Sequence, residues 1–203
     1  VLAGTAIVNL LTQLEETLGD KHDAMVASVL TQVVNIYSET DCMFNKLSCA
    51  KCFVKFAKLT KTEEQITLLF HFLLQNALAK PLFEDPDSEP LRDELFSAGQ
   101  KCIETFGKEH TALFFTFVDE CAAKSGGNET LSLASSVFNA GIAKHLAAGD
   151  EKIKQIQDRM IEKLTSKTTS SVQNTIAKAL PPLIKANAGD GPDLVDKLIN
   201  KAF

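Results

Sequence analysis

The feature that most constrains the fold is a glycine that returns at nearly constant spacing between apolar, helix-forming stretches. Gly107, Gly149 and Gly189 are 42 and 40 residues apart, and Gly19 lies 88 residues before Gly107, which is about two such intervals. A glycine just past a helix end accepts a positive φ without a Cβ clash, so glycine commonly terminates helices. Each of these glycines is therefore predicted to end one helix shortly before a second helix begins.

The repeating unit is predicted to hold two helices. In the segment 151–165, apolar residues recur at helical spacing behind Asp150, a residue suited to the N-cap. Long alternation of apolar and polar residues is nearly absent, so we expect few or no strands. A period of roughly 40 residues with two helices per unit is typical of HEAT and armadillo repeats. We therefore predict an all-α fold, a right-handed α-solenoid of about five HEAT-like helix pairs.

The apolar periodicity predicts about ten helices in five units. The predicted helices cover residues 2–18, 23–38, 42–59, 63–80, 90–106, 110–125, 129–147, 151–165, 169–186 and 192–202. The units cover about 1–38, 41–80, 88–125, 129–165 and 168–203. Residues 81–90 hold three prolines and are interpreted as a longer loop between units. Because neither end of the array reads as a polar capping repeat, we expect the chain to be a fragment of a longer protein.

Composition excludes some classes of function. The 203 residues carry a net charge of −5 with a pI near 5.4, which argues against a dedicated nucleic-acid-binding domain. The charge is uneven, at −8 over residues 1–143 and +3 over residues 144–203, which leaves room for a local basic face. No apolar run approaches the roughly 18 residues that would predict a membrane span.

No arrangement of residues predicts catalysis or a cofactor. The sequence lacks the common nucleophile, nucleotide-binding and zinc-protease motifs. Its four histidines fall on different predicted repeats and are expected at the surface or in a groove. These histidines are His22, His71, His110 and His145. The chain is therefore predicted to bind partners and not to be an enzyme, with no small-molecule substrate.

The five cysteines favour a structural role. They fall within apolar helical stretches and are odd in number, which favours a reducing, cytoplasmic location. Cys49 and Cys52 form the one close pair, and a structural zinc site usually needs a second pair or two histidines. We predict small buried side chains and no bound metal. The cysteines are Cys42, Cys49, Cys52, Cys102 and Cys121.

Basic residues form the candidate contact surface. Lys51, Lys55 and Lys58 recur at helical spacing in one predicted helix, and Lys152, Arg159 and Lys163 do so in another. Lys154 and Lys167 extend the second group. Such stripes bind phosphate backbones through charge, and they are also typical of any solvated helix face. The second group is interleaved with acidic residues, so we expect at most weak contact with phosphates.

The second half of the chain also resembles a known family. The segments that carry the resemblance are Ser97-Ala98-Gly99-Gln100-Lys101-Cys102, Phe106-Gly107-Lys108-Glu109, Ile142-Ala143-Lys144-His145-Leu146, Gly149-Asp150-Glu151-Lys152-Ile153-Lys154 and Leu180-Pro181-Pro182-Leu183-Ile184. Together they resemble the large HEAT-repeat translational activator of general amino-acid control, in the part just before its region similar to fungal elongation factor three.

The resemblance implies a scaffold segment of a ribosome-associated protein in the cytoplasm. Proteins of that family help to activate the kinase that phosphorylates initiation factor two alpha when uncharged tRNA accumulates. None of the matching segments is a catalytic motif, so no functional residue is transferred. The alternative is an adaptor for cytoskeletal or transport partners, such as a tubulin-binding array or a transport receptor. The turns within the predicted pairs lack Trp and are partly acidic, which disfavours tubulin.

Overall fold

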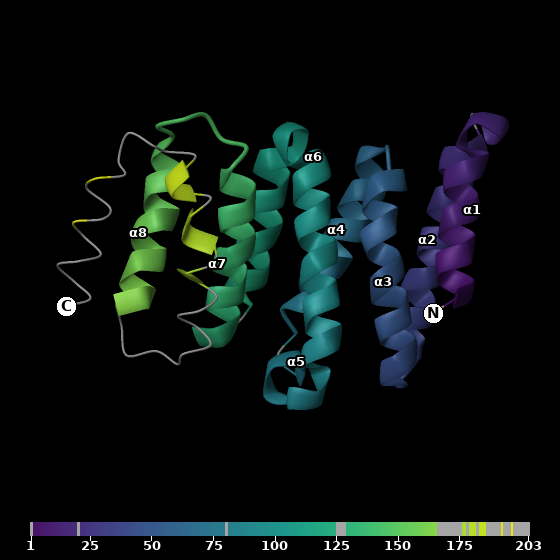
Figure 1. The fold of residues 1–203 in the computed structure, drawn as a ribbon, viewed down its shortest axis with the longest axis horizontal. Helices are drawn as coiled ribbons and strands as arrows, with labels where there is room; N and C mark the ends of the chain where they lie inside the picture. Colours follow the sequence, from purple (N-terminus) through teal and green to yellow (C-terminus); the bar gives the residue numbers. More distant parts are fainter. Residues whose placement is uncertain are drawn as a thin grey trace. The chain divides into compact units, whose positions relative to one another are not determined.

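Every regular element that the structure describes is helical. The computed structural model describes residues 2–19, 21–79, 81–124 and 129–165, with single positions between 176 and 196, and no strand occurs among them (Figure 1). This confirms the all-α class, and the packed helices are consistent with HEAT-like repeats. The elements are α1 (Leu2–Leu18), α2 (Lys21–Glu39), α3 (Met43–Leu59), α4 (Glu63–Ala77), α5 (Pro81–Glu84), the 3-10 helix η1 (Pro86–Ser88), α6 (Glu89–Ala123), α7 (Glu129–Ala143) and α8 (Glu151–Thr165).

The glycine turns were predicted correctly at two positions. Gly19, which follows α1, has a φ of 50°, and Gly149, which precedes α8, has a φ of 84°. Both values lie in the left-handed region that glycine alone adopts without cost. Gly189 and most of the predicted helices 169–186 and 192–202 lie outside the described residues. The five-unit organisation and the right-handed solenoid therefore stay predictions.

The predicted helix end at Gly107 is wrong. Helix α6 continues through Gly107, and its non-helical residue is His110, with a φ of −118° and a ψ of 25°. A Cβ at position 107 would meet the ring of His145, so glycine is required here for close packing and not for a turn. The hydroxyl of Thr111 donates to the carbonyl of Gly107 just before the kink. The break predicted between the helices 90–106 and 110–125 is therefore present, but it lies at His110 and not at Gly107.

The connection after α4 is more ordered than the predicted loop. Pro81 opens the short helix α5 and Pro86 opens η1, because the fixed φ of proline suits a first helical position. The Asp85 carboxylate caps η1 by accepting from the backbone N–H of Asp87 at 3.0 Å and from the hydroxyl of Ser88 at 2.8 Å. Prolines that exclude a long helix here still permit single helical turns.

The chain divides into two compact units, residues 1–106 and 107–203. In the first unit α3 packs against both α1 and α2, and α4 contacts α2 and α3. An aromatic cluster lies between these helices, with the rings of Phe53 and Phe72 at 5.2 Å and those of Tyr37 and Phe72 at 5.3 Å. Burial raises the pKa of Tyr37 to about 12. The largest fully buried side chains of this unit include Phe53, Phe56, Phe70, Leu30, Leu69 and Leu73.

Buried polar side chains link the helix ends of the first unit. His22 is buried, and its Nε2 donates to the carbonyl of Leu11 at 3.0 Å, because that oxygen can only accept. The prediction of a surface or groove position for His22 is therefore wrong. Gln65 is also buried and spans two turns, since its Nε2 donates to the carbonyl of Asp23 at 2.8 Å and its Oε1 accepts from the N–H of Lys61 at 3.1 Å.

In the second unit α7 packs against α8. The core includes Phe114 and Val118 of α6, Phe138 of α7, and Ile153 and Met160 of α8, all essentially inaccessible to solvent. Ile176, Leu180 and Leu183 are buried as well. Gln157 of α8 is buried, and its Nε2 donates to the carbonyl of Leu183 at 3.1 Å. This bond ties α8 to a segment that follows it in sequence.

Candidate contact surface

The cysteines lie mainly in the core. Cys49, Cys52 and Cys102 are buried, as predicted, and burial raises the pKa of each thiol. Cys121 is half-buried, whereas Cys42 is exposed just before α3, which contradicts its predicted place within an apolar helical stretch. Among the described residues, no group of three or more His, Cys, Asp or Glu side chains could hold a metal ion.

The basic residues of α3 do not act as one free stripe. The Lys55 ammonium donates to Oδ1 of Asn9 on α1 at 2.7 Å, so it is engaged in packing the first unit. Lys58 is exposed. Lys51 is also exposed, but it lies at a groove that brings acidic side chains near it. The three lysines thus have three different surroundings.

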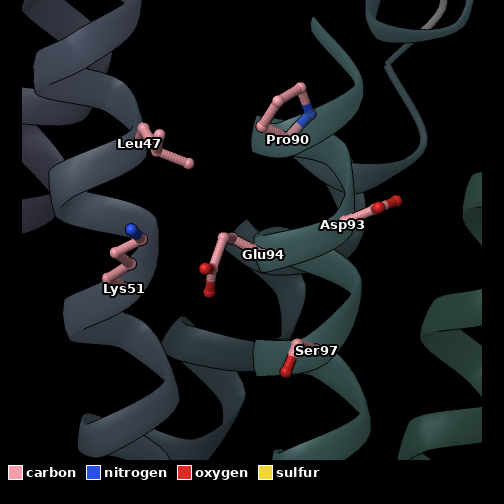
Figure 2. A pocket seen from close by; sticks show the side chains of 6 residues that line it. All are labelled: Leu47, Lys51, Pro90, Asp93, Glu94 and Ser97. Carbon is pink, nitrogen blue, oxygen red and sulfur yellow. The ribbon is translucent and has the colours of Figure 1, made fainter.

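The groove lies between α3 and the first part of α6 and has a volume of about 330 Å³ (Figure 2). Lys51 and Leu47 line it from α3, and Glu94 and Pro90 line it from α6 on the opposite side. Carboxylates at the groove repel a phosphate, so this part of α3 is poorly suited to a nucleic-acid backbone. The lining residues are Leu47, Lys51, Pro90, Asp93, Glu94 and Ser97.

Two of the basic residues of α8 point toward the protein. The Lys152 ammonium lies 3.8 Å from the ring centroid of Phe115, a cation–π contact with α6. The Lys163 ammonium donates to the hydroxyl of Ser132 on α7 at 2.6 Å. Both side chains are half-buried, so they are not part of a fully solvated basic stripe with Arg159, as the spacing suggested. At about 100° per residue, positions 152 and 163 lie beside the stripe of Ile156 and Met160.

The side of α8 that faces solvent carries mixed charge. Its exposed residues include two basic and three acidic side chains, a net charge of −1. Lys154 and Arg159 are the basic residues of the predicted surface that are exposed here, and Lys167 lies outside the described residues. Asp150 accepts from the N–H of Lys152 at 2.8 Å, which confirms it as the cap of α8. The exposed side comprises Glu151, Lys154, Gln155, Asp158, Arg159 and Glu162.

Two curated proteins are distantly similar to the chain. Protein ILITYHIA of Arabidopsis thaliana is 27% identical over 144 residues, which cover 69% of this chain and 5% of that protein. Stalled ribosome sensor GCN1 of Homo sapiens is 27% identical over 140 residues, which cover 68% of this chain and 5% of that protein. The chain thus spans a small fraction of each relative. The similarity supports, in part, the resemblance seen in the sequence.

Other comparisons add no family assignment. No profile of a known protein family matches the chain, and no solved structure matches it significantly. In the part of the chain that the structure describes, we find no helix long and apolar enough to cross a membrane.

Proposed function

We propose that the chain is a HEAT-repeat scaffold segment of a ribosome-associated translational activator. The larger protein promotes phosphorylation of initiation factor two alpha in amino-acid starvation, acts in the cytoplasm, and is not an enzyme. The observation that carries the proposal is the similarity to Stalled ribosome sensor GCN1. It is 27% identity over residues that cover 68% of this chain. The segments on which the sequence resembles the activator family support the same proposal.

The contact surface of this segment is proposed to be small. Lys154 and Arg159 are exposed on α8, and Lys58 with Lys51 is exposed on α3, each among acidic neighbours or alone. Each neutralised phosphate contributes a slope of about −0.7 to −0.9 to the dependence of log affinity on log salt. With so few exposed basic residues in these two groups, their binding to ribosomal RNA is weak and is lost steeply as salt rises. The segment then acts mainly by setting the spacing between stronger contacts elsewhere in the larger protein.

Co-sedimentation with ribosomes at low and moderate salt tests the proposal. Lys154→Glu with Arg159→Glu should reduce the salt-sensitive fraction that sediments, because it reverses both exposed basic charges of α8. Glu151→Gln with Gln155→Lys is the matched control on the same side of the helix, and it should increase binding. Lys152 and Lys163 are left intact because they contact Phe115 and Ser132, so their reversal would disturb packing.

Two results would count against the proposal. If both double variants sediment with ribosomes as the parent does, the exposed side of α8 takes no part in binding. If the longer protein that contains this segment sediments with microtubules and not with ribosomes, the adaptor alternative replaces the translational one.

A further inference from the structure

The groove between α3 and α6 lies within the first unit and has an apolar part and a charged part. On each wall an apolar residue comes one helical turn before a charged one, with Leu47 before Lys51 on α3 and Pro90 before Glu94 on α6. The two apolar residues lie toward one end of the groove, and the two charged residues lie further along it (Figure 2). Because a helix rises 1.5 Å per residue, the two parts are about 6 Å apart along the helix axes.

The charged side chains of the groove do not neutralise each other. Within the described residues, neither the Lys51 ammonium nor the Glu94 carboxylate forms a hydrogen bond or an ion pair. The second carboxylate at the groove, Asp93, lies 3.8 Å from Arg92, which also lies 3.5 Å from Glu89. Glu94 is half-buried, and a carboxylate that has lost part of its water gains most from a cationic donor.

The polypeptide that forms the α6 wall is strongly acidic. Residues 84–94 contain six carboxylates and one arginine, a net charge of −5. A field of this sign attracts basic partners and speeds their encounter, and it repels nucleic acids, acidic peptides and anionic lipids. Charge complementarity therefore selects a basic partner. The six carboxylates belong to Glu84, Asp85, Asp87, Glu89, Asp93 and Glu94.

Exposed apolar side chains extend the apolar part of the groove along α3. Phe44 and Met43 precede Leu47 by one helical turn, and they are 65% and 38% exposed. Apolar area beside unpaired charge is typical of protein interfaces, where an aromatic or aliphatic contact adds to an ion pair. The partner that fits this surface carries an apolar side chain as well as a basic one.

The size of the groove restricts the form of its occupant. Its volume of about 330 Å³ is at the lower end of the roughly 300–1,000 Å³ typical of ligand pockets. It therefore admits side chains and not an α-helix, which is about 10–12 Å across. In an extended chain, alternate side chains share one face and lie about 6.5–7 Å apart. This spacing matches the distance between the apolar and the charged part of the groove.

We infer that the groove binds an extended basic segment of a partner protein, in which an apolar residue and an arginine are two positions apart. The apolar side chain packs on Leu47 and Pro90, and the guanidinium donates to the Glu94 carboxylate. Lys51 donates to a main-chain carbonyl of the segment, because an extended segment leaves its carbonyls available. This site is separate from the exposed side of α8 on which the proposed function was tested, so either can fail without the other.

Fluorescence anisotropy with the 203-residue chain tests the inference. Two labelled probes, short peptides of glycine and serine, carry leucine and arginine two positions apart, one in each order. At least one probe should bind, and Glu94→Gln should weaken its binding roughly fivefold or more, because the charged acceptor of the guanidinium is lost. Glu120→Gln, at an exposed position of α6 that does not line the groove, changes the net charge equally and should leave the affinity unchanged.

A charge exchange gives a second readout that a loss of folding cannot imitate. Glu94→Arg should abolish binding of the arginine probe and should bind a probe in which glutamate replaces the arginine.

Four results would overturn the inference. Binding of neither arginine probe would exclude the site. Equal affinities of Glu94→Gln and Glu120→Gln would mean that only the overall field attracts the peptide. An undiminished affinity for a probe with glycine in place of leucine would exclude the apolar contact. A dimer mass in light scattering that Glu94→Gln abolishes would assign the groove to a second copy of this chain.

Discussion

Helices α1 and α8 both bury one apolar side, but their exposed sides differ. The exposed residues of α1 as far as Leu14 are uncharged and include Ile7 and Leu10. The exposed side of α8 carries five charged residues of both signs and no large apolar residue. In water, mixed charges stay solvated at little cost, whereas exposed apolar area favours burial at about 25 cal/mol per Å². The exposed side of α8 is therefore better suited to water than that of α1.

The largest expected effect compares a buried residue of α3 with an exposed residue of α1. Phe56→Ala removes a fully buried ring of α3 and should destabilise the first unit by about 3–5 kcal/mol. Leu10→Ala, at an exposed position of α1, should change the free energy of unfolding by less than about 0.5 kcal/mol. Urea unfolding followed by circular dichroism measures both. Similar costs for the two variants would mean that Leu10 is packed and not exposed.

A smaller effect is expected from the buried amide of α8. Gln157→Leu leaves the carbonyl of Leu183 without its donor and should cost about 1–3 kcal/mol. Gln155→Leu, two residues earlier and exposed, is the control and should be nearly neutral. Hydrogen exchange of the second unit measures its free energy of unfolding in each variant. If Gln157→Leu is also neutral, α8 does not depend on that bond, and the contrast with its exposed side weakens.

The lysines of α8 should separate into two groups. Lys152→Met removes a cation–π contact with Phe115 and should cost about 0.5–1 kcal/mol. Lys154→Met lies on the exposed side and should leave the free energy of unfolding unchanged within about 0.5 kcal/mol. Thermal unfolding at equal salt compares the two. A larger loss for Lys154→Met would reverse the assignment of the two sides.

The smallest effect concerns an exposed ion pair beside the turn of the first pair. The Lys61 ammonium lies 2.6 Å from the Glu15 carboxylate, and this hydrogen bond lowers the pKa of Glu15 from its usual range. A carboxyl whose pKa is lower in the folded state stabilises above its unfolded pKa, and this contribution is lost as pH falls through the folded pKa. Titration by NMR should show the low value, and Lys61→Gln should raise it. An unchanged pKa in that variant would exclude the pair as its cause.

The sequence by itself determined the local features of this protein. Apolar spacing predicted α1 and α8 with the bounds that the structure shows, and Gly19, Gly149 and Asp150 marked helix ends correctly. These features depend on residues within one or two helical turns, so their neighbours in sequence carry the necessary information.

The tertiary structure alone decided features that depend on distant partners. Gly107 lies inside α6, where a Cβ would meet the ring of His145, and the buried His22 donates its ring N–H to the carbonyl of Leu11. Lys152 and Lys163 turn toward Phe115 and Ser132, which lie on other helices, so counting along α8 did not reveal them. A helical pattern specifies which side of a helix is apolar, but which residues meet at the edges of that side depends on how neighbouring helices pack.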